Sequence, residues 1–443
     1  MFLPDYVRTC IDALEKASFA AYAVGGCVRD ACLGLTPHDY DLCTAATPEQ
    51  MKAIFSGYQL VLAGEKHGTV SVVTEGGLVE ITTFRTEGDY RDNRHPQWVE
   101  FVEDVAGDLA RRDFTVNAMA YSPIRGFADP FGGREDLKNR VLRAVGDPFC
   151  RFREDSLRIL RGVRFSVRYS LDVDEQTMAA MTALTSLMDN LARERVFDEL
   201  CKLLPLVSAE DLRRFAPIFA AVIPELAPMV DFDQHSPHHA YDLYTHTAHV
   251  TAAVNPDLPL RWAALLHDIG KIPTFTRDET GRGHFYGHAK HSAEMANSIL
   301  LRLKAPTALR ERCVTLIGLH MTALEPDKKL LRRRIGQLGL DTVKDLIILQ
   351  EADMGSKGTG KSEEMLQFQL IRNTLQEVLE EDACLSIKDL AINGNDLIQA
   401  GFTPGKSLGQ CLQQLLELVQ DEKIKNQHDA LLEAARLQLG ASE

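Results

Sequence analysis

The stretch that decides the fold lies between residues 25 and 42. It contains Gly25-Gly26-Cys27-Val28-Arg29-Asp30 and, a few residues later, His38-Asp39-Tyr40-Asp41-Leu42. Alternate residues of a β-strand point to the same face, so a strand here would present Asp39 and Asp41 to one site. Paired carboxylates suit Mg²⁺, which takes carboxylates, waters and substrate phosphates as ligands.

The Gly25-Gly26 pair predicts a turn that binds phosphate, because glycine lets backbone N–H groups approach a ligand closely. A helix beginning near Cys27 would add a partial positive charge at its start, and Arg29 adds a full one. A phosphate cradle beside metal-binding carboxylates is typical of phosphoryl or nucleotidyl transfer. The alternative is a surface turn with solvated acids, which the neighbouring Gly-Gly-x-x-Arg element disfavours.

Length and composition fit a globular enzyme of several domains. At 443 residues, roughly two to four domains are expected. The hydrophobic share of 45% and charged share of 25% are ordinary. No apolar run approaches the ~20 residues that cross a bilayer, and the first residues lack the features of a signal peptide, so no membrane partner is expected. Nine cysteines without a Cys-x-x-Cys pair favour reduced thiols and the cytoplasm.

An arginine-rich segment at 151–168 stands out against the net charge of −14. Local charge matters more than total charge for contact with phosphates, so the acidic total does not exclude a nucleic-acid substrate. The spacing by threes and fours predicts one helical stripe, made of Asp155, Arg158, Arg161, Arg164 and Arg168. A neighbouring apolar stripe would anchor the helix through Leu157, Leu160, Val163 and Val167. A carboxylate among guanidinium groups can read a base edge and hold phosphates. The alternative is a solvated helix with internal ion pairs.

The pattern of strands and helices divides the chain into a mixed part and a helical part. Residues 21–24 and 40–42 are predicted strands, and 69–74 with 78–84 are predicted to form a hairpin. Residues 85–97 are polar and aperiodic, which predicts a mobile loop. From about residue 147 strand signals almost vanish. An α+β head followed by an all-α remainder is therefore expected.

Five motifs carry a family resemblance over positions 1–205. They are Gly25-Gly26-x-Val28-Arg29-Asp30, Asp39-x-Asp41, Arg111-Arg112-Asp113-Phe114-Thr115-x-Asn117-Ala118, Glu154-Asp155-x-x-Arg158-x-x-Arg161-x-x-Arg164-Phe165, and Glu194-Arg195-x-x-x-Glu199. In this order they closely resemble bacterial class II tRNA nucleotidyltransferases, the CCA-adding enzymes of the polymerase-β superfamily. The resemblance implies stepwise transfer of CMP, CMP and AMP from CTP and ATP to an immature tRNA 3′ end, without a nucleic-acid template or an obligate protein partner.

The resemblance also implies roles for residues of the head. Asp39 and Asp41 would be the catalytic pair that holds Mg²⁺. Gly26, Arg29 and Arg112 would contact the nucleotide.

Further roles concern recognition of the base. Asp155 and Arg158 would pair with the incoming base, so that the protein itself is the template. Arg161 and Arg164 would line the same pocket. Glu80 is a candidate third carboxylate, on the strand that leads to the predicted loop.

Related activities are separated by two features. Bacterial poly(A) polymerases resemble this signature but are strongly basic, with an arginine-rich strand where this sequence has residues 64–70. Enzymes that add only CC lack a loop element like the one at 88–94, which contains Asp89 and Arg94. Full CCA addition is therefore favoured. Further alternatives are an HD phosphohydrolase with a nucleotide-binding head and a non-enzymatic RNA-binding protein.

A second constellation lies between about 240 and 360. It comprises His246, His267-Asp268, His288, His291, His320 and Asp353. Neighbouring imidazoles and carboxylates suit a divalent metal. The region resembles the HD phosphohydrolase superfamily, which implies His246, His267, Asp268 and Asp353 as ligands of a divalent transition metal. His288, His291 or His320 would serve a second metal, and such a site activates water toward phosphoesters.

The resemblance predicts five consecutive parts of the chain. They are a polymerase-β-like nucleotidyltransferase head at 1–142, a helical neck with the base-recognition helix at 143–205, a helical connection at 206–239, an HD domain at 240–375 and a helical C-terminal segment at 376–443. The basic residues of 328–334 suggest either a tRNA contact or a solvated face.

Overall fold

The computed structural model describes residues 1–88, 99–236, 240–358, 362–381 and 384–440. The chain forms two compact units. The first unit contains residues 1–206 and 215–227, and the second contains 207–214 and 228–443. The chain therefore passes between the units at three points along its length. The five-part division made from the sequence stays a prediction.

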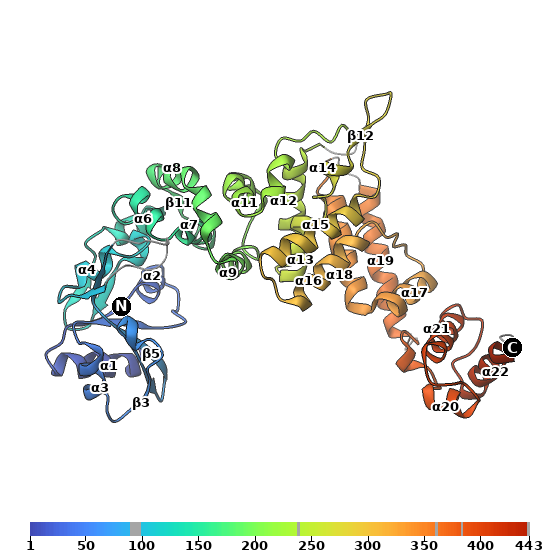
Figure 1. The fold of residues 1–443 in the computed structure, drawn as a ribbon, viewed down its shortest axis with the longest axis horizontal. Helices are drawn as coiled ribbons and strands as arrows, with labels where there is room; N and C mark the ends of the chain where they lie inside the picture. The colour runs from blue at the N-terminus through green and yellow to red at the C-terminus, as the bar shows by residue number, and fades with distance from the viewer. Residues whose placement is uncertain (89–98, 237–239, 359–361, 382–383, 441–443) are drawn as a thin grey trace. The chain divides into compact units, whose positions relative to one another are not determined.

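A seven-stranded sheet forms the head of the first unit (Figure 1). Its strands in spatial order are β3 (Gln59–Val61), β4 (Thr69–Thr74), β5 (Gly77–Thr83), β2 (Asp41–Thr44), β1 (Ala21–Val24), β8 (Ala120–Ser122) and β9 (Gly126–Ala128). β2 and β5 run parallel, whereas the other neighbours run antiparallel. The predicted strand at 21–24 and the predicted hairpin are confirmed.

Alternating burial explains why these segments pair as they do. In the β4–β5 hairpin, Val70 and Val72 face the core opposite Val79 and Ile81, and all four are fully buried. A shift of one residue would expose this apolar set, so the hydrophobic pattern fixes the register. On its other side β5 pairs in parallel with β2, and this register sets Asp41 beside Glu80.

The segment at 85–97 departs from the predicted loop. Residues 85–87 form strand β6 (Arg85–Glu87), which pairs antiparallel with β7 (Val99–Phe101). The polar local sequence did not predict this strand. It forms by pairing with a partner strand more than ten residues along the chain, which a local pattern does not reveal. Residues 89–98, with Asp89 and Arg94, lie outside the described residues.

Helices surround the sheet, and further helices follow it along the chain in the first unit (Figure 1). Around the sheet lie α1 (Asp5–Lys16), α2 (Gly26–Cys32), α3 (Pro48–Ile54), α4 (Val105–Ala110) and α5 (Gly133–Lys138). The following helices are α6 (Pro148–Glu154), α7 (Leu157–Tyr169), α8 (Glu175–Ala183), α9 (Arg193–Leu203) and α11 (Ala216–Val222). Two-residue strands β10 (Val141–Leu142) and β11 (Asp172–Val173) pair in parallel between them.

The predicted arginine helix is confirmed as α7, but the prediction that Asp155 belongs to its stripe is wrong. Asp155 ends α6 in an extended conformation, with φ −142° and ψ 102°, and α7 begins at Leu157. The break arises because the Asp155 carboxylate accepts a hydrogen bond from the Leu157 backbone N–H, at 3.1 Å. Aspartate competes in this way with helical hydrogen bonding.

The second unit is almost entirely helical. Its main helices are α10 (Ala209–Arg214), α12 (Leu243–Ala253), α13 (Leu258–Leu266), α14 (Lys271–Thr274), α15 (His288–Arg302), α16 (Thr307–Leu319), α17 (Lys328–Leu338), α18 (Leu340–Gly355) and α19 (Ser362–Glu380). A small hairpin pairs β12 (Thr276–Arg277) with β13 (Gly283–His284). Helix α12 packs against α10, α13 and α18, and this packing brings distant histidines together.

Three further helices close the second unit. They are α20 (Gly394–Gln399), α21 (Lys406–Gln420) and α22 (His428–Gly440), and they share an apolar core that includes Leu397, Leu415 and Leu431. The basic residues of α17 are paired with acids: Arg332 contacts Glu381 and Glu422, at 2.6 and 2.8 Å. This part of the basic cluster is therefore an ion-paired face rather than a freely solvated one.

Together the units form an α+β head followed by helices, which confirms the predicted fold class. Within the described parts of the chain, every helix is too short or too polar to span a lipid bilayer.

Candidate active site and candidate metal centre

Carboxylates gather where β2 begins. Asp41 is the first residue of β2, and Glu80 is its register partner on β5. Asp39 lies two residues before β2, so the prediction that one strand carries both aspartates is wrong. Burial, together with the carboxylates of Glu80 and Asp39, raises the pKa of Asp41, while Arg112 opposes the shift. Such crowding of negative charge favours a bound cation, and an all-oxygen donor set suits a hard divalent ion.

Gly25 and Arg112 lie in close contact near these carboxylates. Gly25 has φ 74°, which glycine adopts without strain, and a Cβ at that position would lie 2.7 Å from the Nη1 atom of Arg112. The Nε atom of Arg112 is buried and has no hydrogen-bond partner among the described residues. A buried cationic donor without a partner is suited to an anionic ligand. Gly26 opens helix α2 directly after this contact.

The two residues predicted to read the base are held by other side chains. Asp155 accepts a hydrogen bond from Arg195 of α9, at 2.9 Å. Arg158 donates to the Glu154 carboxylate at 2.6 Å and to the Arg111 carbonyl at 3.0 Å. These partners fix the side-chain directions and leave further donors of the Arg158 guanidinium for a ligand.

The next two arginines of α7 are committed to carboxylates. Arg161 donates from Nε and Nη2 to one oxygen of Asp113, at 2.9 and 2.6 Å. Burial alone would raise the pKa of Asp113, but the charge of Arg161 and the hydrogen bond from Asn117 lower it to about 2. Arg164 is buried and pairs with Glu199 of α9. Both carboxylates lie on other elements, so these pairs differ from the ion pairs within a solvated helix that were considered as the alternative.

Arg29 is also buried, with its side chain only 7% exposed. Its guanidinium donates to Asp30, to the Asn117 side-chain oxygen at 2.6 Å and to the Tyr169 hydroxyl. It also stacks over the Tyr169 ring, 4.2 Å from the centroid. The contact with Tyr169 was missed from the sequence, because nothing in the spacing of residues 140 positions apart indicates it.

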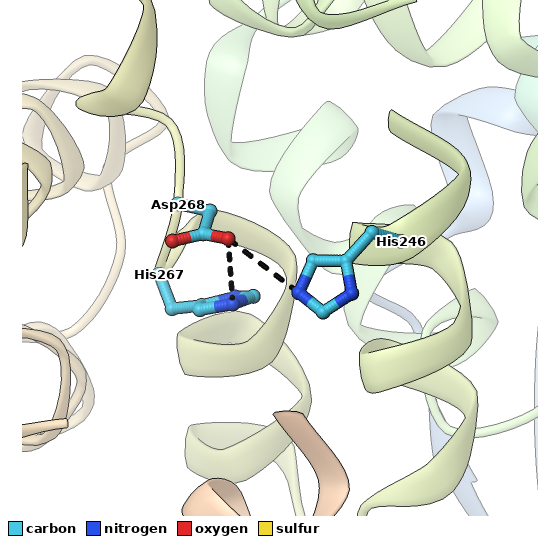
Figure 2. Close-up of side chains that lie close together, drawn as sticks. All are labelled: His246, His267 and Asp268. Atoms are coloured by element: carbon cyan, nitrogen blue, oxygen red, sulfur yellow. Dashed lines mark ion pairs between the residues drawn. The ribbon is translucent and has the colours of Figure 1, made fainter. Parts of the chain in front are cut away.

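The second unit brings together the predicted histidines and aspartates (Figure 2). The Nε2 atom of His246, on α12, lies 3.5 Å from Asp268 and 3.0 Å from Asp353 of α18. His267 ends α13, and its Nε2 atom lies 3.2 Å from Asp268. The candidate ligand atoms of His246, His267 and Asp268 all lie within 4.8 Å of one another. Three of the four predicted ligands therefore form one compact group, and the fourth, Asp353, lies beside it, 3.0 Å from His246 and 4.0 Å from His267.

A second group shares the other oxygen of Asp268. The Nε2 atoms of His288 and His320 lie 3.4 and 4.0 Å from Asp268 Oδ1. Among the described residues, groups of three candidate ligands this compact occur only here and in the first histidine group. His291 lies one helical turn beyond His288, is exposed and is outside both groups.

Each histidine of the two groups is oriented by the backbone. The Nδ1 atoms of His246, His267, His288 and His320 face the carbonyl oxygens of Ser356, Ala264, Phe285 and Ile317, at 3.2, 2.8, 2.9 and 2.6 Å. A carbonyl only accepts hydrogen bonds, so each Nδ1 carries the proton and each Nε2 offers a lone pair toward Asp268. Metal-ligating histidines are arranged in this way.

The electrostatics of the groups suit a cation. Burial and the neighbouring His267 lower the pKa of His320 to about 4, so its imidazole is neutral at pH 7. Burial alone would raise the pKa of Asp268, but His267 and Lys271 hold it well below its usual range. Burial alone would lower the pKa of His267, but Asp268 and Asp353 raise it, so this imidazole would release a proton when a metal binds. Neutral imidazoles and an ionised carboxylate are the forms that bind metal. The Lys271 ammonium, 2.7 Å from Asp268, was not predicted, although it follows Asp268 by one helical turn.

The histidine groups open into a cleft of about 260 Å³. Two cationic side chains, Lys271 and Lys357, line it together with the exposed ring of Tyr286. The cleft can therefore admit a small anionic group beside the candidate metal ligands.

Models of three protein families match parts of the chain. They are the poly A polymerase head domain at residues 21–143, a probable RNA and SrmB-binding site of polymerase A at 170–228, and a putative tRNA nucleotidyltransferase domain 2 at 284–435. The first of these models spans the sheet that carries Asp41 and Glu80.

Full-length relatives are more specific. The CCA-adding enzyme of Ligilactobacillus salivarius is 33% identical over 447 aligned residues, which cover 98% of this chain and 97% of the relative. That of Latilactobacillus sakei is 33% identical and covers 98% of this chain and 99% of the relative. The crystal structure of the Bacillus stearothermophilus CCA-adding enzyme in complex with CTP superposes with a TM-score of 0.69 at 25% identity, covering 100% of this chain and 99% of that one. The chain therefore belongs to the CCA-adding enzymes, a family of nucleotidyltransferases.

Proposed function

We propose that this protein adds CMP, CMP and AMP to the 3′ end of an immature tRNA, using CTP and ATP without a nucleic-acid template. In each step the terminal hydroxyl of the RNA forms a bond to the α-phosphorus, the bond to pyrophosphate breaks, and the hydroxyl proton is lost. The register of Asp41 with Glu80, next to the contact of Gly25 with Arg112, carries this proposal. Its proposed location is the reducing cytoplasm, where thiols such as those of the buried Cys10 and Cys43 persist.

The divalent metal of the reaction is proposed to be Mg²⁺, held by Asp39 and Asp41 with Glu80 as a third carboxylate. When bound, the metal supplies charge stabilisation at the reacting phosphate. Gly26, Arg29 and Arg112 would contact the nucleotide. The buried Nε donor of Arg112 supports this, since it lacks a hydrogen-bond partner among the described residues.

The protein is proposed to read the incoming base with Asp155 and Arg158. A carboxylate accepts from an exocyclic amine, and a guanidinium donates to ring nitrogens and carbonyls. Arg161 and Arg164 would line this pocket, and Asp113 and Glu199 hold their guanidinium groups in place.

The second unit is proposed to contain an HD phosphohydrolase domain at 240–375. His246, His267, Asp268 and Asp353 would hold a divalent transition metal, and His288 with His320 would serve a second ion. The Nδ1 contacts of the four histidines support this set, because they direct every Nε2 atom toward the same carboxylate. Bound metal would supply an activated water for phosphoester hydrolysis.

The nucleotidyl-transfer proposal is tested with a tRNA transcript that lacks CCA. With the purified protein we expect two added nucleotides with CTP alone and three with CTP and ATP together. A long tail with ATP alone would instead identify a poly(A) polymerase, and arrest after two nucleotides with both substrates would identify CC addition. Loss of addition in Asp41→Asn, but not in Asp12→Asn on helix α1, ties the activity to the proposed carboxylates.

The metal proposal has its own test. After incubation with Ni²⁺, Co²⁺ or Mn²⁺ and removal of free ions, mass spectrometry should find metal bound to the wild type and to His291→Ala. Little should be bound to His267→Ala. Equal metal content in all three proteins would contradict the proposed site.

A further inference from the structure

A closed set of hydrogen bonds links helix α7 to helix α2. Arg161 of α7 donates to Asp113, whose other oxygen accepts from the Asn117 side-chain nitrogen at 3.1 Å. The Asn117 side-chain oxygen accepts from Arg29 of α2 at 2.6 Å, and Arg29 donates to the hydroxyl of Tyr169. Tyr169 is the last residue of α7, so the path returns to the helix on which it began. We call this closed path the hydrogen-bonded ring.

Stacking strengthens the same connection. Phe165 contacts two arginines of the hydrogen-bonded ring. The Arg29 and Arg161 guanidinium groups lie 5.3 and 5.2 Å from the centroid of the Phe165 aromatic ring. Arg29, Asp113 and Asn117 are 6%, 7% and 6% exposed, and Tyr169 is 8% exposed. Hydrogen bonds and cation–π contacts are stronger in such a poorly hydrated environment.

The hydrogen-bonded ring joins the two halves of the proposed nucleotide pocket, the triphosphate cradle and the base-reading residues. On one side, Arg29 belongs to the helix opened by Gly26, and Asp113 directly follows Arg112. On the other side, Arg161 lies one turn beyond Arg158. A buried polar network is no more stabilising than apolar packing of the same volume, but it fixes a single geometry when every group is satisfied.

We infer that Asn117 and Tyr169 are positioning residues that, through Arg29, fix the triphosphate cradle relative to the base-reading residues. The inference rests on the proposed nucleotidyl transfer. Neither Asn117 nor the Tyr169 hydroxyl touches the nucleotide; both act through Arg29. Their role is to align the α-phosphate with the RNA hydroxyl once the base is bound.

Tyr169→Phe tests the link most cleanly, because it removes one hydroxyl and keeps the ring beneath Arg29. We expect kcat for addition of the first cytidine to fall about tenfold with KM for CTP changed less than about twofold, since misalignment slows reaction more than binding. The preference for CTP over UTP should fall with it. Tyr121→Phe, in the same unit and outside the ring, should match the wild type.

Asn117→Ala and the double variant of Tyr169→Phe with Asn117→Ala complete a double-mutant cycle. If both residues act through Arg29, the double variant should be no slower than the slower single variant. Losses that multiply would show independent effects and overturn the inference. An unchanged kcat in Tyr169→Phe would also overturn it, whatever happens to the melting temperature.

Hydrogen exchange provides a readout that does not depend on catalysis. In Tyr169→Phe we expect faster amide exchange in α2 as well as in α7, and no change in Tyr121→Phe. Faster exchange in α7 alone would overturn the link. A wild-type protein that adds no cytidine overturns the proposed function instead, and the exchange data then decide the link by themselves.

Discussion

At the level of single residues, the side chains proposed to read the base are held by partners on other elements. Arg195 holds Asp155, and Glu154 holds Arg158. A side chain fixed in this way loses little conformational entropy when a base binds. The final sequence motif, Glu194-Arg195-x-x-x-Glu199, is thereby explained, since its Arg195 and Glu199 hold Asp155 and Arg164.

Replacing Asp41 with asparagine should remove nucleotide addition and leave the fold intact. Loss of a metal-binding carboxylate costs several kcal/mol of charge stabilisation, on the order of a thousandfold in rate. Single-turnover addition of CMP at saturating Mg²⁺ measures the effect, with circular dichroism as the check on folding. Turnover near the wild-type rate would end the proposed role of Asp41.

Replacing Asp155 with alanine should relax discrimination among nucleotides more than it slows addition. A wrong base is rejected because it leaves buried polar groups unpaired, and that penalty disappears with the carboxylate. The ratio of kcat/KM for CTP to that for UTP should fall by about tenfold or more. Arg195→Ala should lower the same ratio less, because the carboxylate is present but unsupported. If UTP and GTP stay as excluded as before, Asp155 does not read the base.

The sequence identified the chemical groups of both sites better than their partners. Carboxylates and imidazoles near one another in the sequence suggested metal sites, and the family resemblance then implied roles for Asp39, Asp41, Asp268 and the histidines, which stay predictions. Tyr169 could not be recognised, since its hydroxyl acts only through Arg29 and contacts between positions 140 apart leave no periodic signal.

At the level of elements, Asp113 anchors helix α7 through Arg161. The pKa of Asp113 is lowered to about 2, below the ordinary value of 3.8, so the ionised carboxylate stabilises the folded state above about pH 4. That stabilisation is lost as the pH falls from about 4 to about 2. Asp113→Asn should therefore lower the free energy of unfolding at pH 7 by about 2 kcal/mol.

The measurement is urea unfolding of both proteins at a series of pH values. The difference between wild type and Asp113→Asn should shrink between pH 4 and pH 2, while Asp12→Asn should show no such trend. A difference that stays constant over this range would contradict the assigned cause.

We predict that the segment at 85–97 is needed to add the terminal adenosine, since enzymes that add only CC lack such a loop element. Most of this segment lies outside the described residues. The flanking strands β6 and β7 pair with each other, so a deletion of 88–94 leaves their register available. We expect the deletion to permit addition of two cytidines and to block the terminal adenosine, as read on sequencing gels. A matched replacement of 88–94 by glycine and serine separates the effect of length from that of chemistry. A deletion variant that completes CCA would contradict the prediction.

The strand at 21–24 and the hairpin of β4 and β5 were predictable from their apolar residues and the turn residues that bound them, whereas β3, β8 and β9 were not predicted. The end of α6 at Asp155 was not predictable from spacing, because intervals of three and four continue across it. A single hydrogen bond from the Leu157 backbone to the Asp155 carboxylate breaks the helix there.

At the level of the whole molecule, each unit contains its own candidate site. The two sites share no residue, so changes in one should spare the other. We expect the double variant His267→Ala with Asp268→Ala to lose metal and any hydrolysis of 2′,3′-cyclic AMP, while addition of CCA persists. His291→Ala is the matched control. Joint loss of both activities in a folded protein would contradict separate sites.

The three passages of the chain between its units limit how the gene can be rearranged. A break after residue 206 separates the first unit from α11, which packs against residues 185–190 within it. A break after residue 227 leaves the second unit without α10, which packs against α12. No single junction therefore yields two halves with complete cores. Recombination at one point cannot exchange either half intact, so the two candidate sites would be inherited together.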